Sequence, residues 1–389
     1  MSKKKLLIIN RSFWPIYPVI GEALLRFAEV NSEKYDVGVI LQDHVGIRKQ
    51  LSDSERGKNV KFYPCKAWTA SGSNVFRRIL DAVFFMVWVF WVLIFVRPEK
   101  IYVSTDPPVL VPFIVAVYSK IFKAKYFYHL QDIHPEAANI VVKINPLIYK
   151  FLKKIDSFSI RNAELIITIT DEMANEIRNR SGFNKKIAIL PNPSIDFDGV
   201  LEKKDREKGF AFCGNAGRLQ RIPLLILAID KYIREGGILK FVFAGAGVYA
   251  NSLREISEKY QNQVFYLGLV SSSKAAELNL EYEWALLPIE DEVTRFAFPS
   301  KSSSYALSGA RIAAICSERT SVAKWVESNN LGVVVHPSVE ALCDFFSSVE
   351  NGVFDREEFS VNRVKLKHDL SFNKFIKSLN ILICDEKDV

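Results

Sequence analysis

Short runs of β-branched and aromatic residues alternate with helix-length stretches along all 389 residues of the chain. The connections are long enough for crossover helices, which parallel strands require. In the first half, strands are expected at 6–10, 37–41, 60–64, 101–105, 126–130, 165–170 and 187–191. In the second half, they are expected at 211–213, 241–244, 264–267, 284–288, 312–316 and 333–336. The pattern predicts an α/β protein of two Rossmann-like domains that face a cleft.

A polar stretch in the middle of the chain marks the expected domain boundary. It follows Pro191-Asn192-Pro193 and is rich in Lys, Asp and Glu, which is typical of a linker. We therefore predict an N-terminal domain at 1–193, a linker at 194–209 and a C-terminal domain at 210–370. Residues 371–389 are expected to form a helix that returns to the N-terminal domain.

The cysteines and the start of the chain favour a cytoplasmic protein. Five widely spaced cysteines form no C-x-x-C pair, so neither a disulfide framework nor a zinc site is expected. Residues 1–6 lead directly into a strand pattern, without the apolar region and cleavage site of a signal peptide.

The positive charge is concentrated in the first half of the chain. Residues 1–200 contain 28 Lys and Arg against 19 Asp and Glu, whereas the remainder contains 24 against 25. A basic, aromatic half fits an anionic membrane surface or nucleic acid, but no basic helix with base-reading residues argues for nucleic acid. Residues 143–154 would present one basic and one apolar face, either as a solvated helix or as a helix on a membrane surface.

The most apolar segment is Ala82–Val96, which allows three interpretations. As a helix its 15 residues would reach about 22 Å, short of the roughly 30 Å of a bilayer core, which argues against a span. It could be a buried crossover helix or a helix that dips into one leaflet. Trp88 and Trp91 favour the leaflet, because indoles prefer the membrane–water interface.

Ligands of such sheets bind at the carboxyl ends of the strands, so the residues that follow each strand are the site candidates. Gly21 opens the helix after the first strand, where it either lets a ligand approach the backbone or forms a plain turn. Asp132, His134 and Glu136 follow the fifth strand and could orient hydroxyls or move a proton. The alternative for Asp132 is an ordinary helix cap.

The second half offers groups suited to a nucleotide. Arg218 and Arg221 lie in a Gly-rich turn after its first strand, and guanidinium groups suit a diphosphate. Gly245 and Gly247 place small residues where a flat base could lie, although core turns explain them nearly as well. The loop Ser300-Lys301 could direct backbone N–H groups and one ammonium at a phosphate.

Five segments, in this order, carry a resemblance to a known family. They are Gly214-Asn215 to Gln220-Arg221, then 243–247, 265–268 and 284–288, and finally Phe298-Pro299-Ser300-Lys301 with Tyr305 to Gly309. Together they resemble the family 4 retaining glycosyltransferases of GT-B fold. The nearest likeness is to bacterial O-antigen and capsule enzymes that transfer an N-acetylated amino sugar such as fucosamine. Segments 104–108 and 131–136 agree with it.

The resemblance implies what each half does. The C-terminal half would bind a nucleotide-sugar, expected to be UDP-linked, with Arg218, Arg221 and Lys301 on its diphosphate and no metal or other cofactor. Gly245 and Gly247 would accommodate the base and ribose. The N-terminal half would bind a polyprenyl-diphosphate-linked saccharide at the inner face of the cytoplasmic membrane, with Asp132 and His134 as the catalytic side chains. Transfer would retain the anomeric configuration.

Two departures from the family pattern keep other functions open. The family carries two Glu seven residues apart near the ribose, where this chain has Ala297 and Ser304; Glu290, Asp291 or Glu292 could replace them from the preceding loop. Gln131 stands where a His is common, which leaves His129 or His134. The alternatives are a UDP-sugar 2-epimerase of the same fold and a catalytically inactive GT-B partner protein.

Overall fold

The computed structural model describes residues 3–68, 75–195, 205–354 and 363–385. The chain divides into two compact units. Unit 1 comprises Met1–Asn192 with Phe372–Val389, and unit 2 comprises Pro193–Ser371. Residues 196–204 of the predicted linker lie outside the described residues.

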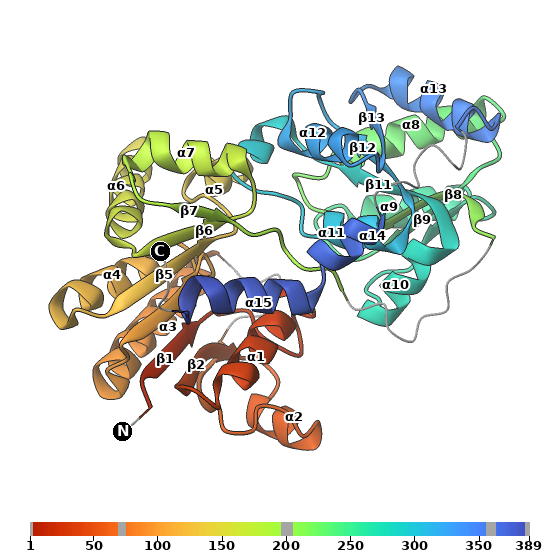
Figure 1. The fold of residues 1–389 in the computed structure, drawn as a ribbon. Coiled ribbons are helices and arrows are strands. Elements are labelled where there is room, and N and C mark those ends of the chain that lie inside the picture. Colours follow the sequence, from red (N-terminus) through yellow and green to blue (C-terminus); the bar gives the residue numbers. More distant parts are fainter. Residues whose placement is uncertain (1–2, 69–74, 196–204, 355–362, 386–389) are drawn as a thin grey trace. The chain divides into compact units, whose positions relative to one another are not determined.

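Unit 1 is built on a seven-stranded parallel sheet of order β3-β2-β1-β4-β5-β6-β7 (Figure 1). Its strands are β1 (Lys5–Ile9), β2 (Asp36–Asp43), β3 (Lys61–Lys66), β4 (Lys100–Ser104), β5 (Lys125–Leu130), β6 (Leu165–Thr168) and β7 (Ile187–Ile189). Every residue of β4 and β6 is buried, because helices cover both faces of the sheet. This explains why the strands read as continuous apolar runs.

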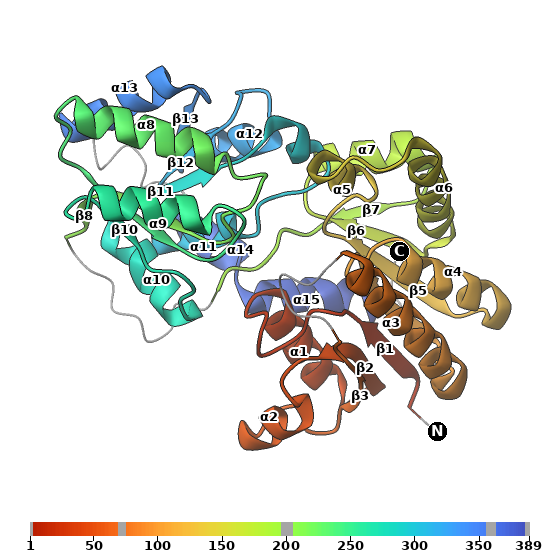
Figure 2. The same ribbon diagram turned by 180° about the vertical axis from the view of Figure 1, so that it is seen from behind.

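The helices of unit 1 form two groups. They are α1 (Ile20–Asn31), α2 (Ile47–Asp53), α3 (Val75–Val96), α4 (Leu110–Phe122), α5 (Glu136–Val141), α6 (Pro146–Asn162), α7 (Asp171–Ser181) and the C-terminal α15 (Phe372–Ile383). Helices α3, α4 and α6 pack in that order, each against the next, whereas α15 packs against α1 (Figure 2). Helix α6 begins at Pro146, and the Asn145 side chain accepts a hydrogen bond from Leu147 N, which caps the helix.

Helix α3 accounts for the apolar segment at Ala82–Val96. It is the crossover helix between β3 and β4, and the side chains of Phe85, Val89 and Leu93 on one face are buried. Val87, Trp91 and Phe95 on the other face are exposed. Among the residues that the structure describes, no helix is both long enough and apolar enough to cross a membrane. The segment therefore combines the core packing of a crossover helix with an exposed apolar face.

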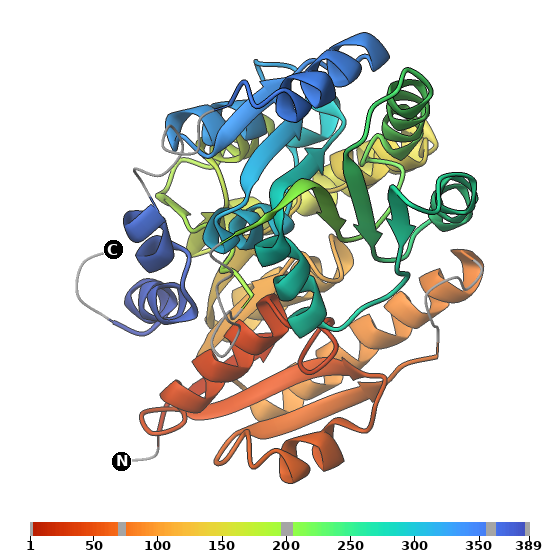
Figure 3. The ribbon, with the colours of Figure 1, turned by 90° about the vertical axis from the view of Figure 1, so that its right-hand side faces the viewer.

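Unit 2 repeats the scheme with a six-stranded parallel sheet of order β10-β9-β8-β11-β12-β13. Its strands are β8 (Glu207–Cys213), β9 (Lys240–Ala244), β10 (Val264–Tyr266), β11 (Tyr282–Pro288), β12 (Arg311–Ile315) and β13 (Gly332–Val335). Its helices are α8 (Ile222–Arg234), α9 (Ala250–Lys259), α10 (Ser272–Glu281), the 3₁₀ helix η1 (Asp291–Arg295), α11 (Lys301–Ser308), α12 (Ser321–Ser328), α13 (Val339–Glu350) and α14 (Arg363–Asp369). Figure 3 shows helices on both sides of the strands in each unit.

The first strand of unit 2 begins earlier than predicted. Glu207 pairs with Tyr282 of β11, and Gly209 pairs with Lys240 of β9, so β8 includes residues 207–209 of the predicted linker. These residues are polar or small and join the sheet through backbone pairing, which an apolar pattern does not reveal. Two parallel sheets covered by helices confirm the predicted fold class of two Rossmann-like domains.

Candidate active site

The predicted site residues lie in loops that follow the carboxyl ends of parallel strands. In unit 2 these are the loops after β8 and β9 and the segment between β11 and α11. In unit 1 they are the connections after β1 and β5, next to the loop after β4. Each unit therefore presents its candidates at the edge where such sheets bind ligands.

Lys301 places its ammonium group inside unit 2. Its Nζ lies 3.7 Å from the centroid of the Phe212 ring and has no hydrogen-bond partner among the described residues. A Cβ atom added to Gly214 would lie 3.3 Å from this Nζ, so the ammonium lies against the turn that follows β8. Burial lowers the pKa of the Lys301 amine to about 7. A cation without a counter-charge thus lies beside a glycine-containing turn.

Cys213, the titratable residue that acts on Lys301 electrostatically, does not neutralise this cation. Burial raises the pKa of the Cys213 thiol to about 12, so the thiol is uncharged at neutral pH. The Tyr305 hydroxyl is engaged with the backbone of Cys213: it accepts from Cys213 N at 3.0 Å and lies 3.2 Å from Cys213 O. An anionic ligand would therefore supply the counter-charge that the described residues around Lys301 do not provide.

Arg221 differs from Lys301 because its charge is already compensated. Its guanidinium lies 3.1 Å from a carboxylate oxygen of Glu290 and 3.1 Å from one of Asp291. Its Nε donates to Ile289 O at 2.7 Å. Asp291 also accepts from Ser317 N at 2.9 Å. The structure thus joins the predicted donor residues Arg221 and Glu290 in an ion pair that fixes the loop after β11.

Arg218 and Ser300 have exposed side chains at the same edge of unit 2. Ser300 directly precedes α11 but forms no side-chain cap. Ser304, where the resemblance expects the second Glu, is buried, and its Oγ accepts from Ile195 N at 3.2 Å. The Ser304 hydroxyl therefore already has one partner within unit 2.

The glycines of the predicted site are required by packing within each unit. A Cβ at Gly245 would lie 1.9 Å from Gly214 O, and one at Gly247 would lie 2.3 Å from Ala216 O. The φ angles of these two glycines are +136° and +152°, which L side chains rarely adopt. In unit 1, a Cβ at Gly21 would lie 2.5 Å from Trp14 N. In all three cases the close neighbour is the chain's own backbone, so a ligand is not needed to explain the glycine.

Asp132 lies in unit 1 beside a second carboxylate. Burial raises the pKa of Asp132 to about 6, and the charge of Asp106 adds to this shift. The backbone N of Asp132 donates to Thr105 Oγ1 at 3.4 Å, which joins the loops after β4 and β5. Asp106 is itself held by Arg11, whose Nε donates to it at 3.0 Å. The sequence interpretation did not predict this Arg11–Asp106 pair.

His134 belongs to a loop that a buried guanidinium anchors. Arg180 of α7 donates to His134 O at 2.7 Å and to Glu136 Oε2 at 2.6 Å, and it is also paired with Asp156. The Arg180 side chain is 0% exposed. Burial lowers the pKa of His134 to about 4, so its imidazole is neutral at pH 7.

Arg180 was missed by the sequence interpretation, although a signal for it exists. It lies seven residues after the buried Met173 and three after the buried Ile177, on the apolar face of α7. A charged residue at a position that should be buried indicates a buried partner.

His129 is part of the core of unit 1. Its Nδ1 lies 2.7 Å from the hydroxyl of Tyr102, and burial lowers its pKa to about 3. Its Nε2 has no partner among the described residues.

Within the same described residues, no group of three or more His, Cys, Asp or Glu could hold a metal ion.

The chain resembles glycosyltransferases in sequence and in fold. No family model matches it. It is 22% identical over 319 residues, 75% of this chain and 76% of the relative, to the probable glycosyltransferase WbjE of Pseudomonas aeruginosa. Sucrose-phosphate synthase of Thermosynechococcus elongatus superposes with a TM-score of 0.70 at 10% identity, over 98% of both chains. HepE of Anabaena, solved in complex with UDP, gives 0.66 at 13% identity, over 97% of this chain and 99% of its own.

Proposed function

We propose that this chain, a glycosyltransferase of GT-B fold, transfers a sugar from a UDP-linked donor, an N-acetylated amino sugar, to a polyprenyl-diphosphate-linked saccharide. The sugar is transferred with retained configuration, and the product belongs to O-antigen or capsular polysaccharide synthesis. Unit 2 binds the donor and unit 1 binds the acceptor.

The observation that carries the donor proposal is the buried ammonium of Lys301. A buried charge without a partner is costly. A diphosphate bound at the Gly214 turn would provide the counter-charge of the Lys301 ammonium, and this attraction would strengthen binding of the donor. This charge also stabilises the diphosphate as it leaves the sugar, without a metal ion. Arg218 and Ser300 lie at the same edge of the sheet and contact the donor from the surface. Arg221 and Glu290 hold the neighbouring loop through their ion pair. Gly245 and Gly247 form the base of the donor site.

Asp132 and His134 act on the acceptor in this proposal. At pH 7 the Asp132 carboxylate is largely ionised and accepts a hydrogen bond from the attacking hydroxyl. The neutral His134 imidazole offers one donor and one acceptor nitrogen to the saccharide. The leaving diphosphate takes the hydroxyl proton, so the chain itself needs no strong base.

Thermal shift with a panel of sugar nucleotides tests the donor proposal. A ligand at 100 times its dissociation constant stabilises the protein by about 2.7 kcal/mol, so UDP and its N-acetyl amino sugars should raise the melting temperature. Lys301→Met should abolish this rise, and Lys274→Met, an exposed lysine of the same unit, should keep it. Epimerisation of a UDP-sugar in the absence of any acceptor would instead favour an epimerase.

A surface of unit 1 supports association with the inner membrane. We call it the α3–α6 surface. Its exposed apolar side chains are Val87, Trp91 and Phe95 of α3, Ile121 and Phe122 of α4, and Leu147, Ile148 and Phe151 of α6. The exposed cations Arg97, Lys123, Lys143, Lys150 and Lys154 lie among them. These three helices contain two carboxylates, Asp81 and Asp156, which are 2% and 1% exposed.

Apolar side chains mixed with cations, on helices whose two carboxylates are buried, are what an anionic bilayer surface attracts. The protein should therefore sediment with vesicles that contain phosphatidylglycerol at low salt, and less so at high salt. Failure to sediment at low salt would refute the membrane proposal and leave the donor proposal intact.

A further inference from the structure

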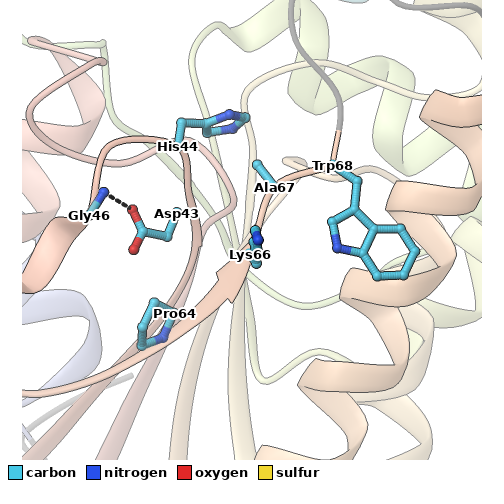
Figure 4. A pocket seen from close by; sticks show the side chains of 7 residues that line it. All are labelled: Asp43, His44, Gly46, Pro64, Lys66, Ala67 and Trp68. Carbon is cyan, nitrogen blue, oxygen red and sulfur yellow. Dashed lines mark hydrogen bonds between the residues drawn. The ribbon is translucent and has the colours of Figure 1, made fainter.

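A pocket in unit 1 lies outside the loops that follow β1, β4 and β5. Its volume is about 640 Å³, which is within the range of small-molecule sites. It is found where β2 and β3 end, and Figure 4 shows side chains from both strands and from the segments that follow them around it. The residues that line it are Asp43, His44, Gly46, Pro64, Lys66, Ala67 and Trp68.

The polar groups of the pocket are of mixed charge. Asp43 is held in place because its Oδ1 accepts hydrogen bonds from Gly46 N at 2.8 Å and Ile47 N at 3.0 Å. Lys66 and His44 are exposed beside it. A carboxylate in the lining disfavours a phosphate group. Fixed acceptors next to flexible donors suit the hydroxyl groups of a neutral sugar.

Trp68 forms an aromatic wall of the pocket. Its indole stacks on Phe84 of α3, with ring centroids 4.3 Å apart and an interplanar angle of 26°. The indole is nevertheless accessible to a ligand, since Trp68 remains 58% exposed. The π face of an indole carries negative charge, which attracts the C–H groups on one face of a pyranose ring. An indole that is fixed by Phe84 and still accessible is therefore suited to stack on a sugar.

The pocket adjoins the α3–α6 surface. Phe84, on which Trp68 stacks, lies on α3 two turns before Trp91 and three turns before Phe95, on the same exposed side of the helix. A sugar whose lipid is embedded in a bilayer under this surface would reach the pocket directly. A free sugar from solution would gain nothing from this arrangement.

We propose that this pocket binds a pyranose ring of the lipid-linked acceptor, stacked on Trp68 and hydrogen-bonded by Asp43, Lys66 and His44. The inference rests on the proposed function, because it takes the acceptor to be a lipid-linked saccharide. It assigns the β2–β3 edge of unit 1 to acceptor recognition, separately from Asp132 and His134.

Calorimetric titration of the full-length protein tests this inference. The probe is farnesyl-diphosphate-linked N-acetylglucosamine, and UDP is titrated into the same samples. Trp68→Ala and Lys66→Ala should weaken binding of the glycolipid at least fivefold, and Trp68→Phe, which keeps an aromatic ring, should weaken it less than Trp68→Ala. Lys125→Ala is the matched control, because Lys125 is an exposed lysine at the start of β5, whereas the pocket lies where β2 and β3 of the same sheet end. UDP binding should be the same in all of these variants.

The two proposals fail in different ways. If the wild type does not bind the glycolipid, or if Trp68→Ala and Lys66→Ala bind it as the wild type does, the pocket is not the acceptor site. If UDP fails to bind the wild type, the proposed function itself is wrong, whatever the glycolipid does. Equal loss of glycolipid binding in Lys125→Ala would also overturn the assignment.

Discussion

Replacing Lys301 by methionine should make the protein more stable and abolish donor binding. In the folded protein the pKa of Lys301 falls from 10.5 to about 7, because burial disfavours the charged amine. At about 1.4 kcal/mol per tenfold change, this difference lowers the free energy of unfolding of the wild type by about 4 kcal/mol at pH 7. Methionine fills a similar volume without a charge, so we expect a gain of about 2–4 kcal/mol.

The pH dependence of this gain identifies its cause. Between pH 7 and pH 10.5 the unfolded chain keeps the Lys301 proton while the folded protein has lost it, so wild-type stability rises with pH across this range. The advantage of Lys301→Met should therefore be largest at pH 7 and below, and should shrink towards pH 10.

Urea denaturation, followed by the fluorescence of the tryptophans, measures both effects at pH 7 and pH 9.5. Lys274→Met is the control, because this exposed lysine pairs with Glu277 and should change stability by less than about 1 kcal/mol. A variant that is less stable than the wild type at pH 7, or a gain that does not depend on pH, would refute a buried, unpaired ammonium. UDP should stabilise the wild type at pH 7 and leave Lys301→Met unchanged.

Three further predictions concern other residues. Asp132→Asn should remove the acidic limb of the pH profile of kcat/KM, which we expect near pH 6 because the wild-type carboxyl loses its charge below its pKa; an unchanged limb would exclude Asp132. Arg180→Met should cost about 3–5 kcal/mol of stability in urea denaturation, since it leaves the buried Asp156 without its Arg180 partner and Glu136 with Lys153 alone; a loss under 1 kcal/mol would contradict this pairing. Phe151→Glu should reduce sedimentation with anionic vesicles severalfold while the melting temperature is unchanged, because this side chain is 63% exposed; equal sedimentation would exclude α6 from the membrane surface.

The strands could be predicted from sequence because a parallel sheet covered on both faces needs continuous apolar runs. The runs at Leu6–Ile9 and Ile312–Ile315 are buried throughout, and this is why the sequence pattern predicted them as strands. The start of β8 was not predicted, because Glu207 and Lys208 are polar, although the backbone of Glu207 pairs with that of Tyr282 in the sheet.

The candidate site was predictable in its position but not in its charges. The carboxyl ends of parallel strands locate the loops, and this follows from the strand pattern. Whether a cation in those loops is free depends on residues distant in sequence: Lys301 lies over Phe212, 89 positions earlier, and Arg221 pairs with Glu290, 69 positions later. From residue type alone, Lys301 and Arg221 were equally good candidates to bind the donor diphosphate.

Helix α3 shows a different limit. Its composition allowed a core helix or a membrane helix as alternatives, because nearly all of its side chains are apolar. In the structure, one face packs on the sheet and the other is exposed, so both properties belong to one element. A hydrophobic periodicity cannot divide a helix that is apolar on every side.

The C-terminal helix determines which fragments of this protein can be produced. Phe375 and Leu379 of α15 are buried against the core of unit 1, and Lys100 Nζ donates to Ile383 O at 2.9 Å. A fragment that stops at Asn192 would expose the apolar side of α1 and should aggregate during expression. A permuted fragment that carries residues 372–385 before Met1, through a flexible spacer, should remain in solution, so isolated-domain experiments on the amino-terminal half need that design.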